Sequence, residues 1–140
     1  MTEPSIDQFM TRSPHTIGHD QTLAAAHRLM REHSIRHLPV LDAGKLVGVL
    51  SLRDLHFIET LKDIDQEQVQ VSEAMSQDVY TIGPRSSVRK VAAEMAEHKY
   101  GCVVAIDKGR VVGIFTVVDA LEALSSLLEA QREAEQRATS

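Results

Sequence analysis

Apolar residues recur at helical spacing in two segments of the chain. In each segment, three of them occupy positions i, i+3 and i+7, which places them on one face of a helix. They are Leu23, Ala26 and Met30 in the first segment, and Val88, Val91 and Met95 in the second. The spacing predicts two amphipathic helices, each of which buries one face.

Two short apolar runs follow each predicted helix. Residues 38–41 and 46–50 form the first pair of runs, and residues 103–106 and 111–115 form the second. The loop within each pair, DAGK or DKGR, contains a glycine that can adopt the positive φ of a hairpin. Runs with such continuous apolar character are typical of strands in a sheet that is covered by helices.

A short extended piece precedes each of these helices, and a second helix follows each hairpin. The extended pieces read HTIG at residues 15–18 and YTIG at residues 80–83, and the closing helices begin at Ser51 and Thr116. The order β-α-β-β-α therefore occurs twice, which predicts an α/β fold.

The two β-α-β-β-α units are copies of each other. At an offset of 65 residues, the separation of Gly48 from Gly113, residues 10–54 align with residues 75–119 without a gap. An ungapped match of this length indicates a tandem duplication. Because one such unit buries little core by itself, we expect the two to pack as a pseudo-twofold pair. We assign residues 1–66 to the first unit with its N-terminal segment, 67–128 to the second unit and 129–140 to a charged helical tail.

Composition and charge limit the classes of protein to which the chain can belong. The net charge of −5 over 140 residues argues against the clustered lysines and arginines of a nucleic-acid-binding surface. No apolar run approaches the roughly 20 residues of a membrane span, and the acidic N-terminus is unlike a secretory signal. The single cysteine, Cys102, is consistent with a reducing compartment. We expect a cytoplasmic protein that contacts neither nucleic acid nor membrane.

The two hairpins and the turns that follow them resemble those of a known family. The segments IRHLPVLDAGKLVGVLSLRDL and YGCVVAIDKGRVVGIFTVVDAL, with the preceding MTRSPHTIGHDQTLAAAHRLM and MSQDVYTIGPRSSVRKVAAEM, are similar to the tandem CBS (cystathionine-β-synthase) domain pair, or Bateman module. The resemblance covers about residues 6–128. It implies regulatory binding of AMP, ADP, ATP, S-adenosylmethionine or a related adenosyl compound in clefts between the two units. It also implies a disc-like homodimer that regulates a protein partner, here as a stand-alone pair with no cofactor.

The resemblance also implies which residues face the ligand. The family's hydroxyl–aspartate motif corresponds to Ser51 with Asp54 and to Thr116 with Asp119. Its leading threonine corresponds to Thr16 and Thr81, and the backbone that reads the adenine edge to Arg36, His37 and Leu38 and to Gly101, Cys102 and Val103. On the family pattern, one cleft combines Ser51, Arg53, Asp54 and Thr81, and the other combines Thr116, Asp119 and Thr16 with His37 or Arg36. Because Arg53 is a certain cation where the second copy has Val118, we favour the first cleft for a phosphorylated ligand.

The chemistry of the motif fits a nucleotide. A hydroxyl residue at the point where a strand enters a helix lies beside unpaired backbone N–H groups, which attract phosphate. Asp54 or Asp119, as acceptor-only side chains, can receive hydrogen bonds from both ribose hydroxyls, and Arg53 can bind phosphate in a bidentate manner. The same spacing is also that of a helix capping box, a purely structural device. The alternative is therefore a ligand-free structural or protein-interaction module.

Two other chemistries are considered and not expected. His15 and His19, like His33 and His37, are four residues apart, but the predicted extended piece and helix end separate the two rings of each pair, and no zinc-site spacing is present. Cys102 adjoins an apolar run, so we expect a buried, inert thiol rather than a nucleophile. No acid–base pair is visible, and we expect neither a metal site nor an enzyme.

Overall fold

The computed structural model describes residues 3–61 and 63–139. Residues 1–2, 62 and 140, which fall within the assigned first unit and the tail, lie outside the described part of the chain.

Each half of the chain contains the expected order of elements. The first half comprises β2 (Ile17–Gly18), α1 (Leu23–His33), β3 (His37–Asp42), β4 (Lys45–Ser51) and α2 (Leu52–Glu59). The second comprises β5 (Thr81–Ile82), α4 (Val88–His98), β6 (Cys102–Asp107), β7 (Arg110–Thr116) and α5 (Val117–Thr139). The elements α1, β3 and β4 correspond to α4, β6 and β7 residue for residue at the offset of 65. The predicted α/β fold of two tandem units is confirmed.

The two hairpin turns have the same backbone conformation. Asp42 pairs with Lys45 across the first turn, which leaves Ala43 at φ 51° and Gly44 at φ 82°. The second turn has the same positive values, φ 52° and 77°, at residues 108 and 109. Positive φ at both central residues defines the two-residue turn that matches the twist of a hairpin, so the predicted role of the glycine is confirmed.

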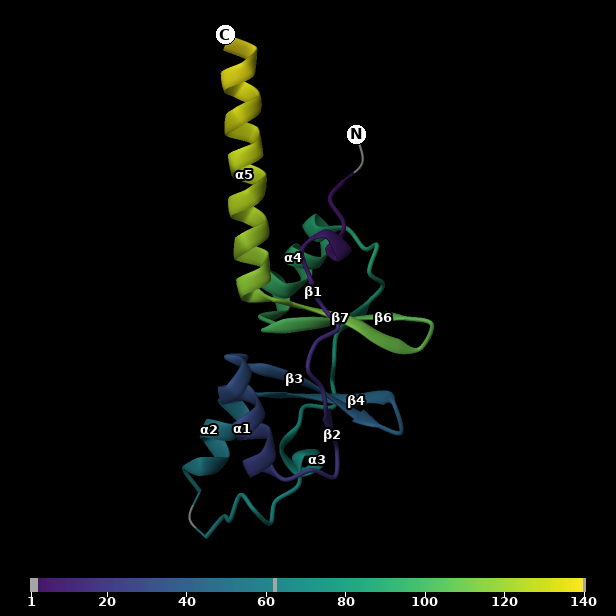
Figure 1. Ribbon diagram of the computed structural model, residues 1–140, viewed down its shortest axis with the longest axis vertical. Helices are drawn as coiled ribbons and strands as arrows, with labels where there is room; N and C mark the ends of the chain where they lie inside the picture. Colours follow the sequence, from purple (N-terminus) through teal and green to yellow (C-terminus); the bar gives the residue numbers. More distant parts are fainter. Residues whose placement is uncertain (1–2, 62, 140) are drawn as a thin grey trace.

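The strands form two sheets that lie against each other near the middle of the molecule. One sheet has the strand order β2-β3-β4, and the other has the order β1-β7-β6-β5, where β1 is Thr11–Arg12. Contacts between β4 and β7 join the sheets. Figure 1 shows α1 and α2 beside the first sheet and α4 beside the second, while α5 extends far beyond the body of the protein. No helix within the described residues is long and apolar enough to cross a membrane.

Two short segments, which we call the exchanged segments, each lie in one half of the sequence but pack against the other half of the structure. The first runs from the 3₁₀ helix η1 (Ile6–Gln8) to β1, which pairs antiparallel with β7 of the second half. The second contains α3 (Val71–Ala74) and Ser76, which forms a two-way backbone bridge with Val49 of the first half. The boundary between residues 66 and 67 separates the two repeats in the sequence. It does not separate the two packed halves of the structure, because each half includes a short segment from the other side of this boundary.

The exchanged segments complete the two hydrophobic cores. Ile6 and Met10 lie in one core with the buried faces of α4, β6 and β7. Val71, which is fully buried, lies in the other core with residues of α1, β3 and β4, and Met75 packs against it. Each core thus contains apolar side chains from both sides of the boundary between the two units.

Candidate functional site

Both hydroxyl–aspartate motifs form helix caps. At the start of α2, the Ser51 backbone N–H donates to Asp54 Oδ2 at 2.9 Å, and the Asp54 N–H donates to Ser51 Oγ at 3.1 Å. At the start of α5, the Thr116 N–H donates to Asp119 Oδ2 at 2.9 Å, and the Asp119 N–H donates to Thr116 Oγ1 at 3.2 Å. The capping interpretation is confirmed for both copies. Since a cap uses only part of each carboxylate, it leaves ligand binding open.

A cleft of about 540 Å³ opens between the two halves at the start of α5. We call it the α5 cleft. The described residues that line it are 11–15, 34–37, 101, 114 and 116–119. They come from the N-terminal segment, the end of α1, the start of β3, the loop before β6, and the junction of β7 with α5. Both halves therefore contribute to one ligand-sized cavity.

Asp119 lies inside the α5 cleft and is the buried charged residue of the described chain, with 8% of its surface exposed. Besides its cap, it accepts hydrogen bonds of 3.3 and 3.4 Å from the Thr11 hydroxyl. Thr11 belongs to β1, the segment that crosses from the first half. The carboxylate that caps α5 is thus also a contact between the exchanged segment and the second half.

The α5 cleft brings together part of the predicted ligand set. Thr116, Asp119, Arg36, His37 and Gly101 all line it. The hydroxyl from the first repeat that faces Asp119 is that of Thr11, whereas Thr16 lies outside the lining. A signal for Thr11 exists in the sequence, since a hydroxyl residue follows the repeated methionine in both copies: Thr11 after Met10 and Ser76 after Met75.

The other predicted set is not assembled in this cleft. Ser51 and Asp54 remain together through the cap, but Arg53 and Thr81 are both exposed, and none of the four lines the α5 cleft. The cations of the α5 cleft are Arg36 and Arg12. Arg53 is exposed and lies outside the lining of the α5 cleft, so the cations available to a ligand in this cleft differ from the one favoured from the sequence.

The segments predicted to read an adenine edge lie at the starts of β3 and β6. The side chains of Leu38 and Val103 are fully buried in the two cores, so only their backbones can approach a ligand. Gly101 leaves room for a neighbouring ring, because a Cβ at this position would lie 3.0 Å from His37 Nε2. The His37 imidazole thus occupies the space at which the two segments meet.

Two guanidinium groups accompany the single carboxylate of the α5 cleft. Arg12 and Arg36 line it together with Asp119, which is the one acidic residue among the described residues of the lining. In a chain with a net charge of −5, this local excess favours an anionic ligand. The Arg12 guanidinium is held by a 2.8 Å hydrogen bond to the Asp7 carbonyl oxygen.

Burial lowers the pKa of His37 below its ordinary value, and Arg36 lowers it further, against an opposing effect of Asp54. The neutral imidazole is therefore favoured in the folded state. The contribution of His37 to the free energy of unfolding is therefore at its maximum above the ordinary pKa of about 6.5. It declines as the pH falls from that value through the lower pKa of the folded state, because the unfolded chain binds the proton first.

We expect the His37→Gln substitution to reduce the acid-induced loss of stability below about pH 6.5. Urea unfolding at a series of pH values measures the effect, with His56→Gln at an exposed position of α2 as the matched control. Identical pH profiles for the parent protein and His37→Gln would contradict the assignment.

The only cysteine, Cys102, lies at the start of β6, where burial raises the pKa of its thiol to about 12. The thiolate is the reactive form, and it is scarce at neutral pH with such a pKa. We expect a thiol-specific reagent at about pH 8 to label the folded protein far more slowly than the protein unfolded in denaturant. Equal labelling rates in the two states would show that the thiol is accessible and activated.

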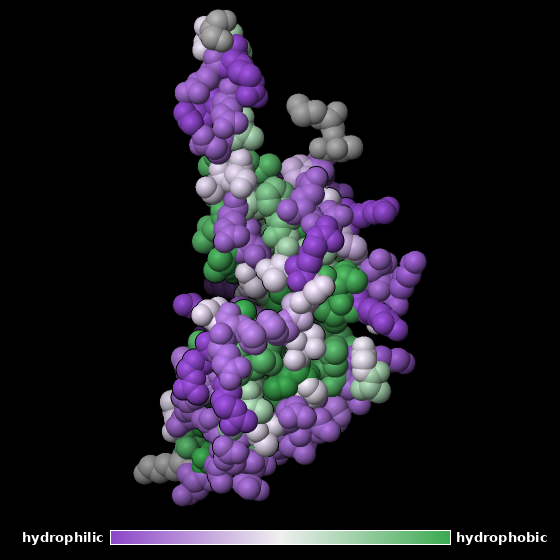
Figure 2. Space-filling model, in the orientation of Figure 1, coloured by the Kyte–Doolittle hydropathy of each residue, from purple (hydrophilic) through white to green (hydrophobic). Residues whose placement is uncertain are grey.

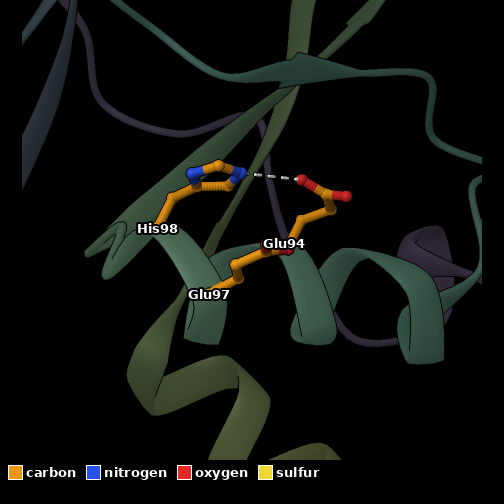
Figure 3. A group of neighbouring side chains, drawn as sticks. All are labelled: Glu94, Glu97 and His98. Atoms are coloured by element: carbon orange, nitrogen blue, oxygen red, sulfur yellow. Dashed lines mark ion pairs between the residues drawn. The ribbon is translucent and has the colours of Figure 1, made fainter.

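A group of potential metal ligands lies on the last turns of α4, away from the α5 cleft. Glu94, Glu97 and His98 offer ligand atoms within 4.8 Å of one another. Figure 3 shows His98 directed toward Glu94, with which it forms an ion pair of 3.3 Å. Among the other histidines, His15 stacks on His33 with ring centroids 3.7 Å apart, and His19 forms an ion pair with Asp42 at 3.4 Å.

Comparison with known proteins defines the family. A model of the CBS domain matches residues 6–57 and 71–126, which places one domain in each half of the fold. The chain therefore belongs to the CBS-domain family and contains a pair of these domains.

Individual relatives agree with this family. The chain is 32% identical over 114 residues to inosine-5′-monophosphate dehydrogenase of Korarchaeum cryptofilum, a match that covers 81% of this chain and 23% of that protein. Among solved structures, the AcuB protein of Vibrio cholerae is 34% identical with a TM-score of 0.84 over 94% of this chain and 98% of its own. The CBS domain pair of protein MJ0100, solved with 5′-methylthioadenosine and S-adenosyl-L-methionine, is 26% identical with a TM-score of 0.75 over 93% and 99%.

Proposed function

We propose that this CBS pair is a regulatory module that binds an adenosine-containing ligand in the α5 cleft and signals through the packing of a homodimer to a protein partner. The observation that carries the proposal is the position of Asp119, a buried carboxylate that lines the cleft between the two halves together with Arg12 and Arg36. The adenosyl ligands in the similar structure of MJ0100 support it.

The groups in the α5 cleft suit the parts of an adenosine nucleotide. Asp119 accepts hydrogen bonds without donating any, so it can receive both ribose hydroxyls in place of the long contacts from Thr11. Arg36 and Arg12 can bind phosphate or another anionic group. The N-terminus of α5, a helix of 23 residues, adds its unpaired N–H groups and the positive end of its dipole.

The first turns of α5 connect the cleft to an exposed apolar stripe. Val117, Leu121, Leu124 and Leu128 follow the 4-3-4 spacing of a helix–helix seam and are between 46% and 59% exposed. Figure 2 shows apolar residues over the lower part of α5 and hydrophilic residues toward its C-terminal end. A second copy of the chain can cover this stripe, which supports the homodimer.

Val117 belongs both to the stripe and to the lining of the α5 cleft. A ligand that contacts the start of α5 can therefore bind one arrangement of the dimer better than another. The shift between arrangements is then limited by the ligand's difference in affinity for the two. In this mechanism the protein is a switch and catalyses no reaction.

A ligand-free interaction module is the second candidate. The observation that favours it is the Asp54 cap, whose hydrogen bonds all serve the start of α2. In that case the Asp119 motif is also only a cap, and the exposed stripe on α5 is the functional surface.

Thermal unfolding with AMP, ADP, ATP, S-adenosylmethionine and 5′-methylthioadenosine, and with GTP as a control, separates the two candidates. A ligand at about 100 times its dissociation constant adds roughly 2.7 kcal/mol to the free energy of unfolding, which raises the melting temperature by several degrees. A rise with adenosine compounds but not with GTP supports the proposal. No rise with any compound at millimolar concentration contradicts it and favours the interaction module.

Sedimentation velocity of the same samples tests the homodimer. We expect a dimer whose frictional ratio changes when an adenosine ligand binds. A monomer at all concentrations, with and without ligand, would rule out signalling through dimer packing.

A further inference from the structure

A second cleft, of about 350 Å³, lies between α1 and α2. We call it the α1–α2 cleft. Its floor is apolar, formed by Met30 and Leu52, and it shares the residues 34–36 with the α5 cleft. The two cavities therefore adjoin each other, and Arg36 belongs to the walls of both.

The polar lining of the α1–α2 cleft is strongly basic. Arg31 and Arg36 contribute guanidinium groups, and His27 and His56 contribute imidazoles. None of the described residues that line this cleft is acidic. The nearby acid Glu59 forms an ion pair of 3.2 Å with His27, whereas Arg31 and Arg36 form no ion pair with any described residue. Two guanidinium groups without a carboxylate partner, beside an apolar floor, favour a polyanion.

We propose that the α1–α2 cleft is a phosphate subsite of the ligand that occupies the α5 cleft, and that the ligand is an adenosine nucleotide with more than one phosphate. The proposal rests on the proposed function, because the nucleoside is held at Asp119. The phosphate chain passes Arg36, where the cavities adjoin, and its terminal groups reach Arg31. The subsite would bind the phosphates that ADP and ATP carry beyond the first, so it would distinguish nucleotides by the number of their phosphates.

Isothermal titration of AMP, ADP and ATP in metal-free buffer tests this inference. We expect the parent protein to bind ATP at least about tenfold more tightly than AMP, a difference equivalent to one charge-assisted contact. We expect Arg31→Gln to weaken ATP binding by about tenfold and to leave AMP binding unchanged. The matched control is Arg28→Gln, which removes the same charge from an exposed position of α1 outside both clefts, and which should leave both affinities unchanged.

The outcomes separate this inference from the proposed function. Equal binding of AMP and ATP, or equal effects of Arg31→Gln and Arg28→Gln on ATP, would overturn the phosphate subsite and leave the adenosine site in place. A loss of AMP binding in Arg31→Gln would also overturn it, because Arg31 would then act on the nucleoside site. If tripolyphosphate alone competes with ATP but not with AMP, the subsite is supported. If no adenosine compound binds, the proposed function itself fails.

Discussion

Replacement of Asp119 by alanine is expected to weaken the binding of an adenosine ligand by about 100-fold or more. Two hydrogen bonds from ribose hydroxyls to a carboxylate contribute about 1.5–3 kcal/mol each, and each 1.4 kcal/mol corresponds to a factor of about ten in affinity. The substitution also removes the cap of α5, at a cost of about 1 kcal/mol of stability.

Asp54→Ala is the matched control for this prediction. Asp54 occupies the same position in the cap of α2 as Asp119 does in the cap of α5, but it lies outside the lining of the α5 cleft. We expect both variants to lose about 1 kcal/mol of stability and only Asp119→Ala to lose the ligand. Titration calorimetry and urea unfolding measure the two effects separately. Retained binding in Asp119→Ala, or an equal loss in both variants, would show that the α5 cleft is not the ribose site.

Gly48→Ala is expected to destabilise the protein by about 1–3 kcal/mol, the usual cost of forcing extra atoms into a packed interior. A Cβ at Gly48 would lie 2.6 Å from Met75 Sδ and 2.7 Å from the Ser76 carbonyl oxygen. The side chain of Met75 can move, but the Ser76 carbonyl oxygen accepts a 2.9 Å hydrogen bond from Val49 N–H and is fixed by that bridge. The methyl group therefore pushes the exchanged segment away from β4.

The equivalent glycine of the second half offers a graded comparison. At Gly113 the atoms that a Cβ would meet all belong to the side chain of Met10, which is flexible and can adopt another rotamer. We expect Gly113→Ala to be less destabilising than Gly48→Ala, as measured by the midpoints of urea unfolding. The reverse order would mean that the second half tolerates displacement of its crossing segment less well than the first.

The sequence repeat predicts most of the fold because the offset of 65 residues relates α1, β3 and β4 to α4, β6 and β7. The periodicity of apolar residues identifies α1 and α4, and the paired runs identify the hairpins with their glycine turns. The exchange of segments could not be predicted in this way. Ile6 and Val71 are recognisable as apolar residues that need burial, but local pattern carries no information on which of two similar cores will receive them.

The candidate site is predictable to a similar extent. The spacing of Thr116 and Asp119 predicts a helix cap, and the residues of this cap form one wall of the α5 cleft. The threonine that faces it depends on the crossing of β1, which makes Thr11 rather than Thr16 the neighbour of Asp119. The sequence favours Arg53 as a phosphate ligand because it is a cation beside the hydroxyl–aspartate motif. In the structure it lies in the first turn of α2 with its side chain exposed. Which residues of a helix turn face a cavity is decided by tertiary packing.

The crossing of the N-terminal segment connects the start of the described chain directly to the α5 cleft. Ile6 is anchored in the core of the second half, β1 is paired with β7, and the Thr11 hydroxyl contacts Asp119. A force applied to the residues that precede Ile6 would therefore act, through a few residues, on the contact between Thr11 and Asp119, the carboxylate proposed to hold the ligand. Tension at this end would pull β1 from the edge of the second sheet and remove Thr11 from the wall of the cleft in the same step.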